Sequence, residues 1–317
     1  MSLQNKAITR REFDPDKYIM HDELQSAVEV AIALGQPLLL TGEPGTGKTL
    51  LANKVAHELH QSDARFRKKP LVFYTKTTST ARDLFYTYDA VSHFQRANLK
   101  QEGSGAVPTT ADFIELQALG QAIAFSNPGD LDQSLFKTEL PAEPQSSVVL
   151  IDEIDKAPRD FTNDILNEIE QFAFQIREQN NYEIEHGGEQ QIVVVMTSNS
   201  EKNLPDAFLR RCVFYHIPFP APDTLLKIVR SQLGAHTDYT ETALTNLIDI
   251  FGRIRDESVR KAPATAELIS WLRMLELKKY MELNPANQKD LMLQNLSVLV
   301  KTREDLEAVR DYLKKTL

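Results

Sequence analysis

Eight consecutive residues have the types and the spacing that hold a polyphosphate. Residues 42–49, Gly-Glu-Pro-Gly-Thr-Gly-Lys-Thr, fit the pattern G-x-x-x-x-G-K-S/T. The glycines let the backbone curl so that successive N–H groups point inward at an anion, and a helix N-terminus adds its partial positive charge. We expect Lys48 to reach the β- and γ-phosphates of a nucleotide and the Thr49 hydroxyl to hold Mg²⁺. The predicted phosphate loop consists of Gly42, Glu43, Pro44, Gly45, Thr46, Gly47, Lys48 and Thr49.

The segments on either side of this loop suit a strand and a helix. Three consecutive leucines at 38–40 indicate a short buried strand before it. After the loop, Leu51, Val55 and Leu59 recur every four residues, which is typical of one face of a helix. A phosphate loop requires this strand–loop–helix setting, whereas an ordinary glycine-rich turn does not.

Two carboxylates follow a second apolar run. Residues 147–151, Ser-Val-Val-Leu-Ile, have the continuous apolar character of a strand that is covered on both faces, and Asp152 and Glu153 come directly after it. Ligands of open α/β sheets bind at the carboxyl ends of the strands, so both acidic residues should lie beside the phosphate loop. We expect Asp152 to hold the water shell of Mg²⁺ and Glu153 to orient and polarise the attacking water.

Polar residues after a third apolar run extend the predicted site. The strand pattern at 191–196 leads to Asn199, whose neutral amide can hydrogen-bond the γ-phosphate or the attacking water without repelling either. Farther along, a short helix over 204–211 ends in Arg210 and Arg211. Arginines at a helix end often bond to its last carbonyls. A guanidinium that reaches a neighbouring subunit's site would instead neutralise charge on the transferred phosphoryl group.

Strand and helix patterns alternate over residues 21–220, which predicts a parallel sheet between helices. The first helix is expected over 21–34, ending at Gly35. The stretch 75–146 is too long for a single crossover, so we expect an insertion there with helices over 81–93 and 111–125. The predicted strands are 38–40, 71–74, 147–151, 191–196 and 213–217.

The chain changes character after the proline-rich residues 218–222, and every later pattern is helical. This change predicts a second, all-α region. Its expected helices are 223–233, 240–255, 265–283, 287–300 and 304–315.

Composition excludes several classes of function. The net charge of −9 argues against a sequence-independent grip on nucleic acid, which depends on lysine and arginine. A single cysteine, Cys212, rules out an internal disulfide and a cysteine-rich metal site. No apolar run approaches the ~20 residues that span a bilayer, and the N-terminus lacks the apolar core of a signal peptide. We therefore expect a cytoplasmic protein with neither nucleic acid nor membrane as a partner.

The order of these parts resembles the AAA+ ATPases. The matching pieces are GEPGTGKT, LIDEIDKAP, MTSN, LPDAFLRRC and the helical C-terminal region. Within that family the chain looks most like the MoxR-like branch of the helix-2-insert clade, because of the run DEIDKAPRDFTNDILNEIEQ, the LPDAFLRR helix and the long stretch before the acidic strand.

This resemblance implies a fold, and it covers essentially the whole chain. The fold is an α/β P-loop AAA+ core with a five-stranded parallel sheet, followed by a smaller all-α lid domain. Residues 1–20 would be a leader that contributes to the nucleotide site, and 21–220 the core, with insertions near 76–146 and 172–186. Residues 221–317 would form the lid.

The resemblance also implies roles for residues that match the family's motifs. Lys48 and Thr49 match Walker A, Asp152 and Glu153 match Walker B, Asn199 matches sensor 1, Arg211 matches the arginine finger with Arg210 as the adjacent candidate, and Tyr18 and Ile19 lie where the family packs the adenine. The lid departs from the pattern, because Ala264 and Ala266 occupy the positions where a sensor-2 arginine usually lies. Lys261 or Arg260 would have to substitute for it.

Two segments resemble the parts of this clade that face the axis of a ring. Residues 172–185 alternate around Asn180-Asn181, a good β-hairpin turn, and resemble the hairpin that precedes sensor 1. The segment with residues 83–86 would hold the helix-2 insert. The alternative for both is a solvent-exposed loop with no contact role.

The leading hypothesis is an ATP hydrolase that uses Mg²⁺, assembles into a homo-oligomeric ring and remodels a protein client in the manner of a chaperone. The resemblance implies that the ring is a hexamer. Resemblance also implies a von Willebrand factor A-type partner. A second hypothesis is a GTP-using motor like McrB, but no N/T-K-x-D motif follows the strands, and residues 53–56 lack the aspartate. A third is a nucleotide-gated scaffold with little turnover, against which Glu153 and Arg211 count.

Overall fold

The computed structural model describes residues 13–99, 109–200, 204–234 and 237–316. Most of the predicted leader and the centre of the first predicted insertion therefore lie outside the described residues. The chain divides into two compact units. The α/β unit comprises residues 20–42 and 48–217, and the helical unit comprises residues 1–19, 43–47 and 218–317.

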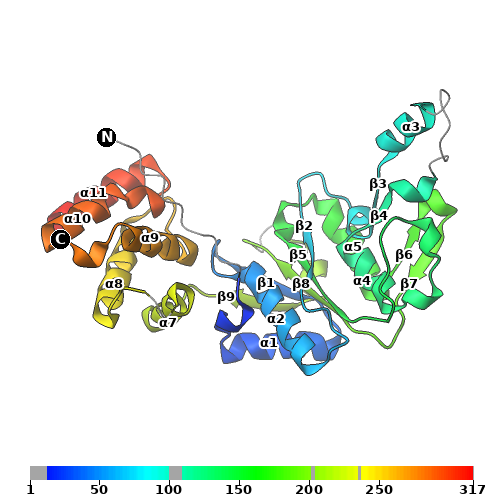
Figure 1. Cartoon of the computed structure of the whole chain (residues 1–317), viewed down its shortest axis with the longest axis horizontal. Helices are drawn as coiled ribbons and strands as arrows, with labels where there is room; N and C mark the ends of the chain where they lie inside the picture. Colours follow the sequence, from blue (N-terminus) through cyan, green and yellow to red (C-terminus); the bar gives the residue numbers. More distant parts are fainter. Residues whose placement is uncertain (1–12, 100–108, 201–203, 235–236, 317) are drawn as a thin grey trace. The chain divides into compact units, whose positions relative to one another are not determined.

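The α/β unit is built on a five-stranded parallel sheet, as the sequence predicts (Figure 1). Its strands lie in the order β2-β5-β8-β1-β9, so the first strand of the chain is inserted between the last two. Leu40 pairs with Thr197 and Ile151 with Met196, so β1, β5 and β8 end at the same edge. The bounds are β1 Leu38–Gly42, β2 Leu71–Tyr74, β5 Ser147–Asp152, β8 Ile192–Thr197 and β9 Val213–Ile217.

Helices of the α/β unit pack on this sheet through apolar faces. α1 ends where Gly35 adopts a φ of +63° and donates its N–H to the carbonyls of Ala31 and Ile32, which is the predicted glycine stop. α2 begins at Lys48, within the phosphate loop, and buries Leu51 and Val55 against the sheet. The helices are α1 Asp22–Leu34, α2 Lys48–Ser62, α4 Ala118–Ser126, α5 Arg159–Gln171 and α6 Asp206–Leu209.

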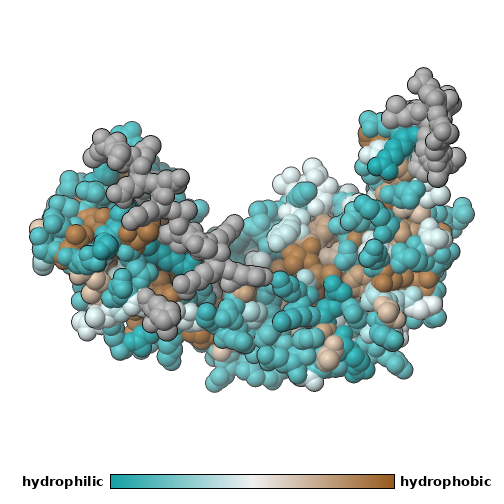
Figure 2. Space-filling view, in the orientation of Figure 1, coloured by the Kyte–Doolittle hydropathy of each residue, from teal (hydrophilic) through white to brown (hydrophobic). Residues whose placement is uncertain are grey.

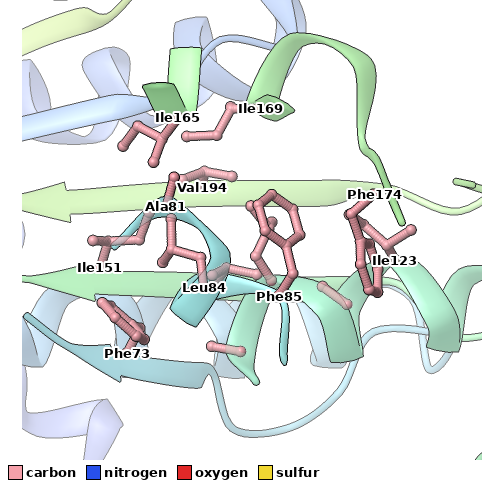
Figure 3. Packing of buried hydrophobic residues seen from close by; sticks show 14 of the residues in the cluster. Phe73, Ala81, Leu84, Phe85, Ile123, Ile151, Ile165, Ile169, Phe174 and Val194 are labelled. Carbon is pink, nitrogen blue, oxygen red and sulfur yellow. The ribbon is translucent and has the colours of Figure 1, made fainter. Parts of the chain in front are cut away.

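The main core of the α/β unit joins the sheet to α5 and to the insertion. Figure 3 shows Phe73, Ile151 and Val194, from three neighbouring strands, in one cluster with side chains of α5 and of residues 81–85. Ile151 and Val194 are buried, so packing in the core fixes β5 and β8, the strands that lead to the polar residues of the predicted site.

The two helices predicted within the insertion, 81–93 and 111–125, are wrong over much of their length. Each segment begins with a single turn of 3-10 helix, continues as a three-residue strand and becomes helical only afterwards. The two strands pair antiparallel, with Tyr86 opposite Leu116 and Tyr88 opposite Ile114. Their alternation of buried and exposed residues spans only three residues, too few to compete with a helical pattern. The elements are η2 Ala81–Leu84, β3 Tyr86–Tyr88, α3 Ala90–Leu99, η4 Thr110–Phe113, β4 Ile114–Leu116 and α4.

The hairpin predicted over 172–185 is confirmed. β6 (Ala173–Ile176) and β7 (Tyr182–Glu185) pair antiparallel, with Ile176 opposite Tyr182. Asn180 and Asn181 both adopt left-handed backbone conformations, with φ of +55° and +57°, which asparagine tolerates better than most residues. The hairpin also belongs to the core, because Ile176 and Ile184 are fully buried.

The helical unit contains the five predicted helices with shifted ends. Its core surrounds Trp271 and Phe251, which are both fully buried. The helix predicted over 265–283 ends at Leu277, because Lys279 adopts a φ of +58° before a separate 3-10 turn. The helices are α7 Pro222–Leu233, α8 Glu241–Glu257, α9 Thr265–Leu277, α10 Pro285–Gln294 and α11 Arg303–Thr316.

Hydrophilic residues predominate in both units on the face drawn in Figure 2, and apolar residues appear between them in small groups. Within the described parts of the chain, no helix is long and apolar enough to cross a bilayer.

Candidate nucleotide-binding site

Lys48 lies where β1, α2 and β8 meet. β1 ends at Gly42 and α2 begins at Lys48, so residues 43–47 of the predicted phosphate loop form the whole connection between them. The Lys48 Nζ donates to the carbonyl of Gly42 at 2.8 Å and to Asn199 Oδ1 at 3.1 Å. Lys48 is only 7% exposed, and these two acceptors hold its ammonium at the carboxyl ends of two adjacent strands.

Thr49 and Asp152 are in direct contact. The Thr49 hydroxyl donates to Asp152 Oδ1 at 3.0 Å, which joins the first turn of α2 to the end of β5. The Thr197 hydroxyl, from the end of β8, donates to the same oxygen at 2.6 Å. Asp152 is buried, so both hydroxyls hold its carboxylate in one orientation.

Glu153 is positioned by an unusual backbone conformation. Its φ of +57° turns the chain sharply after β5, and its N–H donates to Thr197 Oγ1 at 2.9 Å. Thr197 therefore holds both acidic residues, one through its hydroxyl hydrogen and one through its oxygen. The Glu153 carboxylate is 42% exposed and forms an ion pair with Lys156, which raises the pKa of that lysine.

Asn199 completes the group of polar residues at this edge. Its amide oxygen accepts from Lys48, and its backbone N–H donates to Asp155 Oδ1 at 3.3 Å. The structure thus brings together Lys48, Thr49, Asp152 and Asn199 from α2, β5 and the end of β8, with Glu153 next in sequence.

The donor set suits Mg²⁺ bound together with a nucleotide. A threonine hydroxyl next to a carboxylate provides the few protein oxygens that Mg²⁺ needs when phosphates and water complete its octahedron. Over the described residues there is no group of three or more His, Cys, Asp or Glu side chains that could hold a metal by itself.

The predicted arginine finger lies elsewhere on the α/β unit. Arg211 Nε donates to Glu170 Oε1 at 2.7 Å, and the Arg211 side chain is 43% exposed. Its Nη1 donates to the carbonyl of Ala207, as an arginine at a helix end commonly does. Arg210 is exposed.

Residues of the helical unit lie close to two glycines of the phosphate loop. A Cβ on Gly45, which has a φ of +78°, would lie 3.1 Å from Ala264 Cβ and 3.5 Å from Ala266 Cβ. The two alanines at the predicted sensor-2 positions therefore pack against the loop. A Cβ on Gly47, with a φ of +94°, would lie 3.2 Å from the ring of Tyr18.

The predicted sensor-2 substitutes bond within the helical unit. The backbone N–H of Lys261 donates to Asp305 Oδ2 at 3.1 Å, and Arg260 Nε donates to Glu304 Oε2 at 2.7 Å. Ile19, predicted to contact adenine together with Tyr18, is half-buried.

Sequence reasoning missed the roles of Thr197 and Arg255. Threonine is common in strands, so the pattern at 191–197 does not reveal that its hydroxyl serves Asp152 and Glu153. Arg255 contacts Glu43, 212 positions away in the sequence, and no local pattern predicts such a pair.

The parallel sheet and the phosphate loop define a P-loop nucleotide-binding protein. Residues 38–220 match the family described as "ATPase family associated with various cellular activities (AAA)", and the chain belongs to this family. The predicted AAA+ fold is thereby confirmed. No curated protein matches the chain significantly.

Solved structures to which the chain is similar include domain III of the replication initiation protein DnaA from Thermotoga maritima, with 14% identity, coverage of 90% of this chain and 96% of that one, and a TM-score of 0.48. A katanin structure, from work on its self-assembly, has 15% identity, coverage of 93% and 83%, and a TM-score of 0.42. A RuvB variant from Thermotoga maritima has 17% identity, coverage of 90% and 70%, and a TM-score of 0.46.

Proposed function

We propose that the chain binds and hydrolyses ATP with Mg²⁺ at the carboxyl ends of β1, β5 and β8. The observation that carries this proposal is the convergence of Lys48, Thr49, Asp152 and Asn199 through hydrogen bonds of 3.0–3.1 Å. Membership of the AAA family supports it.

Each residue has a task in this proposal. Lys48 exchanges its contacts with Gly42 and Asn199 for phosphate oxygens of ATP. Thr49 and Asp152 hold Mg²⁺, which supplies positive charge to the β- and γ-phosphates. Glu153 orients the attacking water and accepts its proton, which requires its carboxylate to leave Lys156. Asn199 then has an amide available for the γ-phosphate or the water.

The remaining parts of the site stay predictions. Tyr18 and Ile19 would contact the adenine, with residues 1–20 as a leader, 21–220 as the nucleotide-binding core and 221–317 as the lid.

We further propose a ring of identical subunits, hexameric as in the MoxR-like branch, that remodels a protein client or a von Willebrand factor A-type partner. The exposure of Arg211 supports this, because an exposed side chain is accessible to a neighbouring subunit. To act there, its guanidinium would have to leave Glu170 and the carbonyl of Ala207 in its own chain. In a ring, Arg211 would stabilise the charge that develops during phosphoryl transfer in the site of the neighbouring subunit.

Phosphate release from Mg-ATP, measured against protein concentration together with molecular mass in solution, tests both parts. We expect turnover per subunit to rise as the chain assembles, and Lys48→Ala to abolish it. Full turnover from a monomer would contradict the ring, and no turnover at any concentration or mass would contradict ATP hydrolysis.

A further inference from the structure

Glu43, the second residue of the phosphate loop, contacts an arginine of α8. Arg255 Nη2 donates to Glu43 Oε2 at 3.0 Å and to Oε1 at 3.3 Å. This ion pair lies within the helical unit, to which residues 43–47 belong by their contacts. The loop that is predicted to bind a polyanion therefore carries a carboxylate, and that carboxylate is neutralised from α8.

Arg255 is itself fixed in place. Its guanidinium carbon lies 3.5 Å from the ring centroid of Phe219, and its Nη1 donates to the carbonyl of Pro263. The side chain is 14% exposed. On the same helix, Arg253 pairs with Asp249 as an ordinary surface ion pair, with the two side chains 48% and 61% exposed. Phe219 and Pro263 hold Arg255 in the geometry that meets Glu43, so little side-chain entropy is lost on pairing.

The main chain of Glu43 also shapes the loop. Its carbonyl accepts from the Thr46 hydroxyl at 2.8 Å and from the Thr46 N–H at 3.4 Å, which closes the turn. Holding the Glu43 side chain therefore limits how far this turn can move.

We propose that Arg255 is a positioning residue for the phosphate loop and that nucleotide affinity depends on it. This inference rests on the proposed function. Without Arg255, the Glu43 carboxylate would lose this cationic partner in a loop that must accept phosphates, and the loop would lose one of its anchors. Both effects weaken binding of ATP. Arg255 contacts no reacting group, so the rate at saturating ATP should change less than the affinity.

Equilibrium binding of a fluorescent, non-hydrolysable ATP analogue with Mg²⁺ to the full chain tests this proposal. We expect Arg255→Gln to raise the Kd for the analogue about tenfold. This is the effect of losing a hydrogen-bonded charge pair, and it is reduced because solvent screens the exposed Glu43 side chain. Adding Glu43→Gln removes the negative charge that Arg255 no longer faces, so the Kd of the double variant should recover to within about threefold of the wild-type value. Arg253→Gln is the matched control and should bind like the wild type.

The recovery separates positioning from general support of the fold. If Arg255 only stabilised the helical unit through Phe219 and Pro263, changing Glu43 would restore nothing. Wild-type affinity in Arg255→Gln, no recovery in the double variant, or an equal defect in Arg253→Gln would each overturn the inference. Failure of the wild type itself to bind the analogue would overturn the proposed function, and this inference with it.

Discussion

Thr197→Val isolates one hydroxyl that serves both acidic residues of the site. Valine has nearly the shape of threonine, and Thr197 is 1% exposed, so the substitution removes hydrogen bonds without opening a cavity. Asp152 Oδ1 then keeps only Thr49 of its two hydroxyl donors, and the Glu153 N–H loses Thr197 as its acceptor.

The expected cost follows from the two lost bonds. A hydrogen bond to a charged group contributes about 1.5–3 kcal/mol, and a buried N–H left unpaired costs about 1–3 kcal/mol. Because Asp152 retains Thr49, we expect the free energy of unfolding to fall by about 2–4 kcal/mol. The Glu153 N–H loses the hydrogen bond that holds this residue in its conformation with a φ of +57°. Because Glu153 is the proposed general base, turnover of ATP should fall more than affinity for ATP.

Urea denaturation of the wild type and of two variants measures this cost. Thr75→Val is the matched control, because Thr75 is also buried, at 6% exposed, and its hydroxyl has no partner among the described residues. It should be neutral or slightly stabilising. Equal stability of Thr197→Val and Thr75→Val would refute the role assigned to the Thr197 hydroxyl.

Three further predictions concern other parts of the chain. Arg211→Ala should bind ATP but lose most turnover, and mixing it with inactive Lys48→Ala should restore some phosphate release; co-assembly without recovery at any ratio would argue against action between subunits. Burial raises the pKa of the Glu168 carboxyl, so its deprotonation above pH 4.5 costs stability in the folded state; in urea titrations Glu168→Gln should be more stable than the wild type at pH 8, by a margin that shrinks towards pH 4.5, and a constant margin would contradict this. Ile184→Ala, at a fully buried hairpin position, should lower the free energy of unfolding by about 2–4 kcal/mol, whereas the exposed Glu183→Ala should not; equal effects would show that the hairpin is not part of the core.

The central sheet was predictable because strands buried on both faces are continuous apolar runs. Residues 147–151 and 191–196 could each be recognised from their own letters. The strands within the insertion were not predictable, because β3 and β4 are stabilised by pairing with each other and by burial of Tyr86 and Leu116. Such short strands depend on contacts between distant segments, and local periodicity predicted helices there instead.

The convergence of Lys48, Thr49, Asp152 and Asn199 was predictable from one geometric rule, that parallel strands present their carboxyl ends at one edge. Contacts made by single side chains could not be predicted in this way. The pairing of Glu43 with Arg255 depends on how α8 packs, and the orientation of the Thr197 hydroxyl depends on the register of β5 and β8. No spacing in the sequence encodes either one.

The most direct test of ATP hydrolysis at this site is phosphate release by Glu153→Gln at saturating Mg-ATP, compared with the wild type. Glutamine keeps the shape of the side chain but cannot accept the proton of the attacking water. We expect ATP binding to be retained and the rate to fall by about 10²–10⁴, the usual contribution of a general base. Phosphate release near the wild-type rate would contradict the role of Glu153 and with it the proposed site.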